Sequence, residues 1–170
     1  SFTVKNVYFM GRAPTGAQDI RLAVNWAIRA IKDNARFVIE NCHFEWIRRH
    51  CFALNSQFNT IIVKNCVFRN NQAMAGVWGG AGAVTSNNPA DSVIMVNNTM
   101  VNCNCLLFNV RFNTVNYCRL EHNTIVNTLN EFTLWEWPSN AIFSNNIFYN
   151  VHALGETKLD MEKHDPDALP

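Results

Sequence analysis

Apolar residues occupy every second position in several short stretches of the chain, and one such arrangement returns six times. Two clear copies are "FVIENCHFEW", which begins at Phe37, and "IIVKNCVFRN", which begins 24 residues later at Ile61. In each copy an Asn-Cys pair separates two alternating segments. Alternation on both sides of a polar pair predicts a short β-strand, a bend and a second short strand.

The copies align on a polar anchor residue at the bend, and three columns are apolar in every copy. The anchors are Asn6, Asn41, Asn65, Asn97, His122 and Asn145. Four residues before the anchor stand Phe2, Phe37, Ile61, Val93, Cys118 and Ala141. Two residues before it stand Val4, Ile39, Val63, Met95, Leu120 and Phe143. Three residues after it stand Phe9, Phe44, Phe68, Met100, Ile125 and Phe148.

A second alternating phrase lies between the copies and predicts a further strand in each period. It occurs as "RLAVN" at Arg21, "CFALN" at Cys51, "AVTSN" at Ala83, "CLLFN" at Cys105 and "FTLWE" at Phe132. Because a strand cannot bury a face alone, successive copies must stack with parallel strands about 4.8 Å apart. The chain is therefore expected to wind as a coil.

The repeat resembles that of a known class of coiled β-proteins. The motif VxIxNCxFxxN, seen across residues 38–46, 62–70 and 142–150, is similar to the repeat of right-handed parallel β-helix proteins of the pectate-lyase-like fold. The resemblance covers about residues 2–150. It implies an all-β, right-handed parallel β-helix (solenoid) of about six coils, an architecture that hosts many functions, polysaccharide degradation among them.

Two insertions and a tail interrupt the repeat. The insertions are expected at about residues 11–34 and 71–83, the second being the Gly-rich loop "AMAGVWGGAGA". Within the first we expect a strand at 20–24, followed by an irregular or one-turn helical excursion at 26–34. Residues 151–170 lack the repeat and are expected to form an extended arm or linker. With no cap predicted before Phe2, we expect residues 1–170 to belong to a longer or assembled protein.

Asparagine is unusually frequent, at 25 residues, and its spacing predicts side-chain ladders. One ladder is expected at the first bend and another at the next, because stacked amides satisfy each other and the backbone; a sugar-binding row is the alternative. The ladder residues are Asn98, Asn123 and Asn146, then Asn70, Asn102, Asn127 and Asn150. Phe44, Phe68 and Phe148 are expected to stack inside the tube. Cys42 and Cys66 are expected to be core thiols, with disulfide pairing among the six cysteines left open.

The charge pattern excludes some partners. A net charge of +1 and 16 % charged residues give no electrostatic case for binding nucleic acid or an anionic membrane. No apolar run approaches the roughly 18 residues of a membrane span. Lys5, Glu40 and Lys64 alternate in sign on successive coils and, with Glu45 beside Arg69, are expected to form exposed ion pairs. With no Asp cluster and no C-x-x-C motif, we expect no metal and no cofactor.

Two groups of residues are candidates for binding or catalysis. Arg48, Arg49 and His50 are expected at a corner, where they would grip a uronic acid or sulfate group, or else form a solvated turn. Trp78, Trp135 and Trp137 are candidate glycan contacts, because tryptophan rings suit stacking on sugars; alternatively they cover a core edge. The paired carboxylates of a glycosidase are not evident.

These patterns favour a non-catalytic scaffold over an enzyme. Outward positions such as Val38, Ile62 and Ile94 carry more apolar surface than an isolated tube needs. We therefore expect an extracellular or cell-surface structural protein that self-associates, packs on a missing part of a longer chain, or contacts polysaccharide. The alternative is a polysaccharide lyase or glycoside hydrolase of the pectate-lyase-like fold.

Overall fold

The computed structural model describes residues 1–11, 26–47, 50–54, 56–71, 82–86, 89–103, 106–110, 115–128, 133–134 and 140–151. These residues form three parallel sheets. The first sheet contains β1 (Phe2–Lys5), β4 (Arg36–Glu40), β7 (Asn59–Lys64), β10 (Ala90–Val96), β13 (Val115–Glu121) and β16 (Asn140–Ser144). The second contains β2 (Tyr8–Met10), β5 (His43–Glu45), β8 (Val67–Arg69), β11 (Thr99–Val101), β14 (Thr124–Thr128) and β17 (Ile147–Val151). The third contains β3 (Trp26–Ala30), β6 (His50–Leu54), β9 (Gly82–Ser86), β12 (Leu106–Val110) and β15 (Thr133–Leu134).

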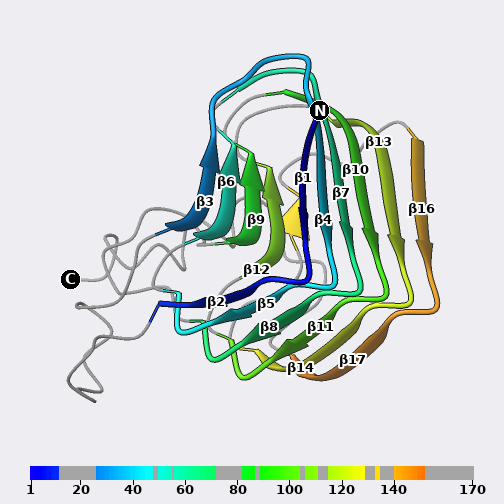
Figure 1. The fold of residues 1–170 in the computed structure, drawn as a ribbon. Coiled ribbons are helices and arrows are strands. Elements are labelled where there is room, and N and C mark those ends of the chain that lie inside the picture. The colour runs from blue at the N-terminus through cyan, green and yellow to red at the C-terminus, as the bar shows by residue number, and fades with distance from the viewer. Residues whose placement is uncertain are drawn as a thin grey trace, which may run out of the picture.

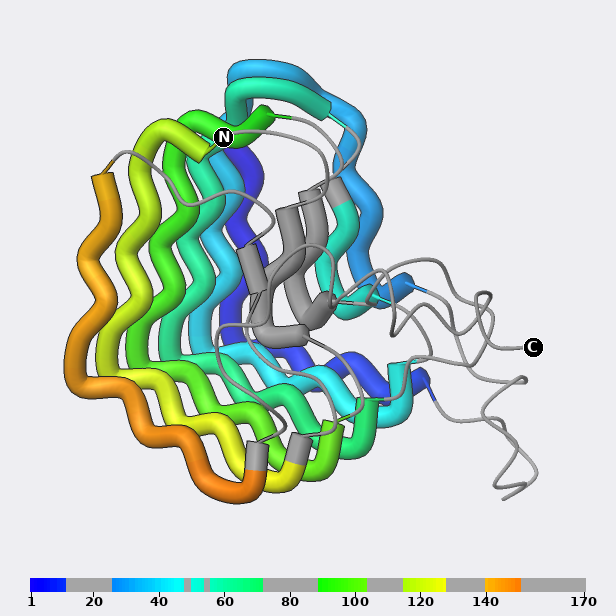
Figure 2. Tube along the Cα trace, turned by 180° about the vertical axis from the view of Figure 1, so that it is seen from behind, coloured from blue at the N-terminus to red at the C-terminus, as the bar shows by residue number. Residues whose placement is uncertain are grey.

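The three sheets are the sides of a right-handed parallel β-helix, which confirms the predicted fold class. Each coil runs down the first sheet, turns into the second, and rises along the third before it returns to the first (Figure 1). The reverse view shows the coils stacked in chain order, from the blue N-terminal coil to the orange C-terminal coil (Figure 2).

The register of the first two sheets is the one predicted from the apolar columns. In the first sheet, Phe2 pairs with Phe37, which pairs in turn with Ile61, and the column continues to Ala141. In the second sheet, Phe9 pairs with Phe44, and that column continues to Phe148. The constant columns pin the register, because a slip of one residue would turn every apolar side chain outward.

The core of the β-helix is a pile of inward side chains. The Phe9 and Phe44 rings stack at 4.8 Å and the Phe44 and Phe68 rings at 5.2 Å. Phe148 belongs to the same column, but Met100 and Ile125 lie between it and Phe68, so the pile of rings is interrupted. The four inner coils bury this column almost fully, and each large side chain so buried stabilises the fold by about 1.5–3 kcal/mol.

The first coil has a strand of the third sheet at a position where none was predicted. The strand β3 lies at Trp26–Ala30, where an irregular excursion was expected, and Ile28 pairs with Phe52 of β6. The strand β3 ends 11 residues before the anchor Asn41, and β6 likewise ends 11 residues before the anchor Asn65. The position of this strand is therefore fixed by the bend that follows it, and not by the anchor that precedes it. The predicted strand at 20–24 lies outside the described residues.

Most of the length variation between coils occurs at one bend. Two residues separate the first sheet from the second in every coil, and three to five separate the third sheet from the next coil. Between the second and third sheets the connections are residues 11–25, 46–49, 70–81, 102–105 and 129–132. The first and third of these are the long ones, so both insertions leave the coil at the same corner.

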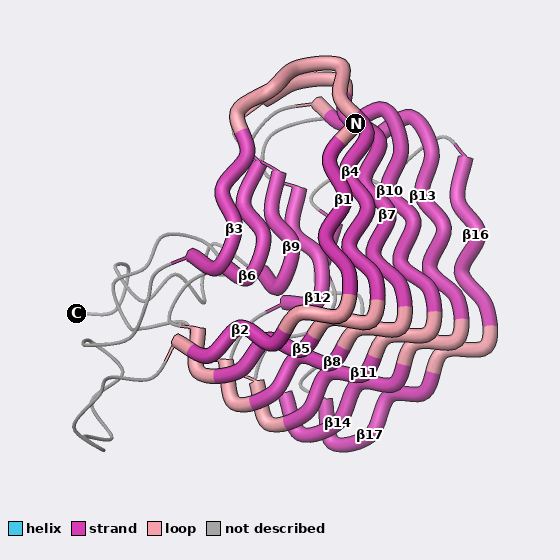
Figure 3. The backbone as a smooth tube through the Cα atoms, viewed as in Figure 1, coloured by secondary structure: helices cyan, strands magenta, loops and turns pink. Residues whose placement is uncertain are grey.

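The described residues contain strands, bends and loops, as Figure 3 shows. Within them, no helix has the length and apolar character needed to cross a lipid bilayer. The expected arm after residue 151 lies outside the described part of the chain.

Candidate functional site

The bends of the coil are built on left-handed residues. All six anchors have φ between 54° and 58°, and a second row has φ between 50° and 58° five residues later. That second row contains Trp46, Asn70, Asn102, Asn127 and Asn150. Among residues other than glycine, asparagine tolerates this conformation best. The asparagines at these two corners are therefore selected by backbone conformation as well as by their amides.

An amide ladder fills the inside of the first bend. Nδ2 of Asn123 donates to the Met95 carbonyl at 2.9 Å, and Oδ1 of Asn123 accepts from the Asn98 backbone N–H at 3.0 Å. Asn146 repeats both contacts with Leu120 and Asn123 at 2.8 and 2.9 Å. Asn98 and Asn123 are buried. These hydrogen bonds are the asparagine ladder that the spacing predicted, and they hold each coil to the one before it.

Cysteine thiols continue this ladder in the early coils. Asn98 donates to the Val63 carbonyl, and Cys66 and Cys42 stand in the same column, with Sγ 3.7 Å from the Ile39 and Val4 carbonyl oxygens, respectively. Asn71 and Cys103 form a second such pair inside the next bend, against the carbonyls of Phe44 and Phe68. The spacing did not reveal Asn71, because it is adjacent to the more regular Asn70.

The buried thiols are chemically quiet. Cys42, Cys51, Cys66, Cys103 and Cys118 are all free and buried. Burial raises the pKa of Cys66 and of Cys118 to about 12. Burial also raises the pKa of Cys51 well above its usual range, with a smaller contribution from the neighbouring Cys103 and Cys66. A thiol that keeps its proton is a poor nucleophile and a poor metal ligand.

The outer asparagines stack as well. Nδ2 of Asn127 donates to Asn102 at 3.1 Å, and Asn150 donates to Asn127 at 2.9 Å. Asn70 differs from the others, since its amide donates to Oε1 of Glu45 at 3.1 Å. Anchor residues form similar outer contacts, such as Asn41 to Asn6 and Asn97 to Asn65.

Ion pairs cross-link the outside of the first bend. Glu40 accepts from Lys5 at 2.7 Å and from Lys64 at 3.0 Å, which confirms the predicted alternation of sign. Hydrogen bonds from Lys5 and then Lys64 lower the pKa of Glu40. Glu121 is held in the same way by Ser144 and Arg119, in that order of effect, and its pKa is also lowered.

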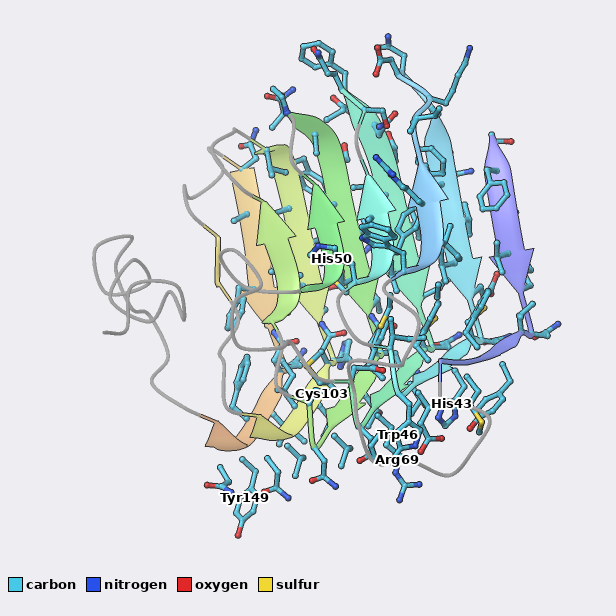
Figure 4. The ribbon with its side chains drawn as sticks, turned by 90° about the vertical axis from the view of Figure 1, so that its left-hand side faces the viewer. His43, Trp46, His50, Arg69, Cys103 and Tyr149 are labelled. Atoms are coloured by element: carbon cyan, nitrogen blue, oxygen red, sulfur yellow. The ribbon has the colours of Figure 1, made fainter. Side chains whose placement is uncertain are left out.

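The densest group of titratable side chains in the described residues lies on the second sheet of the first three coils. We call Tyr8, His43, Glu45, Arg69 and Asn70 the Tyr8 cluster. The Tyr8 hydroxyl donates to Oε2 of Glu45 at 2.5 Å, and the Tyr8 and His43 rings meet edge to face at 4.6 Å. Nε2 of His43 is buried 3.5 Å from Oε2 of Glu45 and, within the described residues, makes no hydrogen bond. Figure 4 shows His43, Trp46 and Arg69 together, with Tyr149 at the far end of the sheet.

The electrostatics of the Tyr8 cluster centre on Glu45. The hydrogen bond from Tyr8 is the main cause of a lowered pKa at Glu45, with Asn70, His43 and Arg69 adding to it. The same hydrogen bond raises the pKa of Tyr8, so its hydroxyl keeps its proton. Glu45 and Arg69 lie opposite each other in register, but the ion pair predicted between them is not formed, since Glu45 accepts from Tyr8 and Asn70 instead.

Of the residues predicted to contact a glycan or to act in catalysis, the structure describes His50 alone. His50 is the first residue of β6, pairs with Trp26 and is only 8 % exposed, so it does not lie on a solvated turn. Arg48, Arg49, Trp78, Trp135 and Trp137 lie outside the described residues. Among those described, no group of three or more His, Cys, Asp and Glu side chains is arranged to hold a metal ion.

The chain matches no family model, no curated protein and no solved structure. Its assignment as a parallel β-helix solenoid therefore rests on its own sheets and register.

Proposed function

We propose that the chain is a non-catalytic β-helix scaffold of the pectate-lyase-like architecture, acting outside the cell or at its surface. One observation carries the proposal: every carboxylate in the described residues accepts a hydrogen bond or forms an ion pair with another residue of the β-helix. Asp33 accepts from the Gln57 N–H of the next coil at 2.8 Å. Asp91 accepts from Ser92 of its own strand at 2.8 Å and from the Thr60 hydroxyl of the previous coil at 3.4 Å. The others are Glu40, Glu45 and Glu121, each held by the contacts described above.

Carboxylates held in this way link adjacent coils. A glycosidase needs two carboxyl groups free to face one sugar. Here the acids hold adjacent coils in register, as the amide ladders do inside the bends. The outward apolar side chains, such as Ile142 and Ile147, favour contact with another protein surface or a glycan.

An activity screen tests this proposal directly. The purified chain is incubated with a panel of neutral, uronic-acid and sulfated polysaccharides, and unsaturated products and reducing ends are measured. The scaffold proposal predicts no turnover above the buffer control. Turnover that co-purifies with the chain and is lost in a Tyr8-cluster variant would overturn it.

The Tyr8 cluster favours a second candidate function, a polysaccharide lyase or hydrolase. It combines a protonated hydroxyl, an imidazole and the exposed cation Arg69 on one face, the kinds of group that a lyase uses to hold a sugar acid and transfer a proton. If this candidate is correct, Tyr8→Phe abolishes turnover while leaving the melting temperature nearly unchanged, and Arg69→Ala raises KM for uronic-acid substrates more than for neutral ones. Neither change affects the rate if the cluster is structural.

A further inference from the structure

One bend residue departs from the backbone rule that the later coils follow. Trp46 has a φ of 58°, in the left-handed region, whereas the equivalent residue of each later described coil is asparagine. A bulky side chain is strained in this conformation, and asparagine adopts it at a lower cost. The bend itself therefore does not require tryptophan, and strain kept at a single coil points to a use outside the fold.

The neighbouring coils hold the bend that carries Trp46. A Cβ atom at Gly11 would lie 2.5 Å from the Trp46 carbonyl oxygen, so a side chain at that position in the first coil would displace the bend. The Trp46 N–H donates to the Arg69 carbonyl of the third coil at 3.4 Å. Trp46 also interrupts the outer amide row: it has no amide, and Asn70 donates to Glu45 instead.

The Tyr8 cluster lies beside Trp46 and presents a positive charge to solvent. Both carboxylate oxygens of Glu45 accept hydrogen bonds, from Tyr8 and Asn70, and the Glu45 side chain is only 14 % exposed. Arg69 is exposed, and its guanidinium forms no ion pair with another described residue. Trp46 is half-buried and Tyr8 is exposed. Figure 4 shows Trp46 and Arg69 at the same end of the second sheet. We call Tyr8, Trp46 and Arg69 the Trp46 patch.

We propose that the Trp46 patch binds an anionic sugar unit of a polysaccharide, either a uronic acid or a sulfated sugar. An indole ring gives the apolar face of a sugar ring a surface on which to stack. A guanidinium binds a carboxylate or sulfate group through two parallel hydrogen bonds. The inference rests on the proposed scaffold function and deepens it, because it names the class of glycan and the surface that binds it.

The surroundings of the patch argue against other partners. A neutral glycan would cover Arg69 without supplying a counter-charge. Nucleic acid needs several cations to neutralise its phosphates, whereas Lys5 and Lys64 are already paired with Glu40. An extended peptide adds to an unpaired strand edge, but β5 and β8 are each paired on both sides. An anionic sugar is the partner that uses both the aromatic ring and the cation.

Glycan pairs that share a backbone but differ in charge test the class of ligand. β-1,4-Glucuronan oligosaccharides are compared with cello-oligosaccharides, which differ from them at C6, and dextran sulfate is compared with dextran. Isothermal titration calorimetry measures each affinity at about 0.15 M salt, where long-range attraction is screened. We expect the anionic member of one pair to bind about tenfold more tightly or better, and that pair identifies the bound group as carboxylate or sulfate.

Substitutions in the patch separate a role in binding from a role in the fold. Trp46→Asn installs the residue of the later coils, so we expect the melting temperature to rise by roughly 2–4 °C while the affinity falls about tenfold. Arg69→Gln should keep the melting temperature and abolish the preference for the anionic glycan. Tyr149→Ala is the matched control and should leave the affinity unchanged, because Tyr149 is 68 % exposed at the far end of the same sheet (Figure 4).

The outcomes also separate this inference from the scaffold proposal. The binding inference is wrong if the wild type binds neither anionic glycan, binds both members of each pair equally, or binds as tightly after either substitution in the patch. In those cases an absence of turnover still supports the scaffold. If Trp46→Asn fails to fold by circular dichroism, the Arg69→Gln result decides. Turnover of a polysaccharide would overturn the scaffold proposal and leave the measured binding intact.

Discussion

Asparagine serves three purposes at the residue scale, and its position in the coil decides which. At the anchors it accommodates a left-handed backbone, with φ near that of Asn65 at 54°. One residue later, as at Asn123, its amide links two coils inside the bend. Five residues after the anchor, as at Asn127, it combines the left-handed backbone with an outer amide contact. A count of asparagines alone would assign one purpose to all of them.

Replacing Asn123 tests the inner ladder. Asn123→Ala leaves the Met95 carbonyl and the Asn98 N–H unpaired in the core, and each unpaired buried group costs roughly 1–3 kcal/mol, so we expect a loss of about 3 kcal/mol in the free energy of unfolding. Asn123→Cys is expected to cost about half as much, because Cys66 keeps a thiol in the equivalent position. Urea unfolding monitored by circular dichroism measures both values.

A matched control lies nearby on an outward position. Asn116 is exposed in β13, so Asn116→Ala should change the free energy of unfolding by less than about 0.5 kcal/mol. Equal losses at Asn116 and Asn123 would contradict the role given to the ladder.

At the element scale, the first bend holds each coil to the next through an outer row of charges and an inner row of amides. The outer row of the first bend contains Glu40 and Glu121. Hydrogen bonds lower the pKa of both carboxyl groups, from Lys5 and Lys64 at Glu40 and from Ser144 and Arg119 at Glu121. A carboxyl group whose pKa is lower in the folded state than in the unfolded state stabilises the fold at pH values above the unfolded pKa. This contribution is lost as the pH falls through the folded pKa. The bends therefore make the fold acid-sensitive.

The pH dependence of the melting temperature tests this linkage. Because the pKa values of Glu40, Glu45 and Glu121 are lowered from 4.5, the melting temperature should hold steady above about pH 5 and fall as the pH drops toward 3. Glu40→Gln should lower the melting temperature at neutral pH and make the acid loss smaller. An acid loss of the same size in wild type and variant would exclude a contribution from Glu40.

The elements also show how far the sequence predicts this fold. Three apolar columns, repeated in six copies around an anchor residue, predicted the register of two sheets, because period-two alternation allows no slip. The strand at Trp26–Ala30 was not predicted, since the alternating phrase that begins at Arg21 assigned the strand of this coil to residues 20–24. The Tyr8 cluster and Asn71 were missed because sequence columns show which residues stack, but not which side chains hydrogen-bond across columns.

At the scale of the whole molecule, the coils form one continuous core in which each coil contacts its immediate neighbours. Stacked repeats of this kind gain stability from the sum of their neighbour interfaces. The buried thiols, such as those of Cys66 and Cys118, lie in different coils along that core. The reactivity of these thiols therefore shows whether the core opens at single coils or all at once.

Thiol labelling tests the integrity of the column. In the native protein we expect Cys42, Cys51, Cys66, Cys103 and Cys118 to resist iodoacetamide at about pH 8, because all five are buried. Burial also raises the pKa of Cys51, Cys66 and Cys118, which suppresses their thiolates further. In denaturant all five should react, and peptide mapping by mass spectrometry identifies each site. Native labelling of any one of them at the rate of an unfolded control would show that its coil opens on its own.

Most extra residues enter the coil at the corner between the second and third sheets, where the connections range from residues 46–49 to residues 11–25. The first bend always contains two residues, and the bend from the third sheet to the next coil contains three to five. The molecule can thus diversify along one edge while its frame stays unchanged. That edge is the natural place for evolution to alter recognition, and for an engineer to graft a foreign peptide.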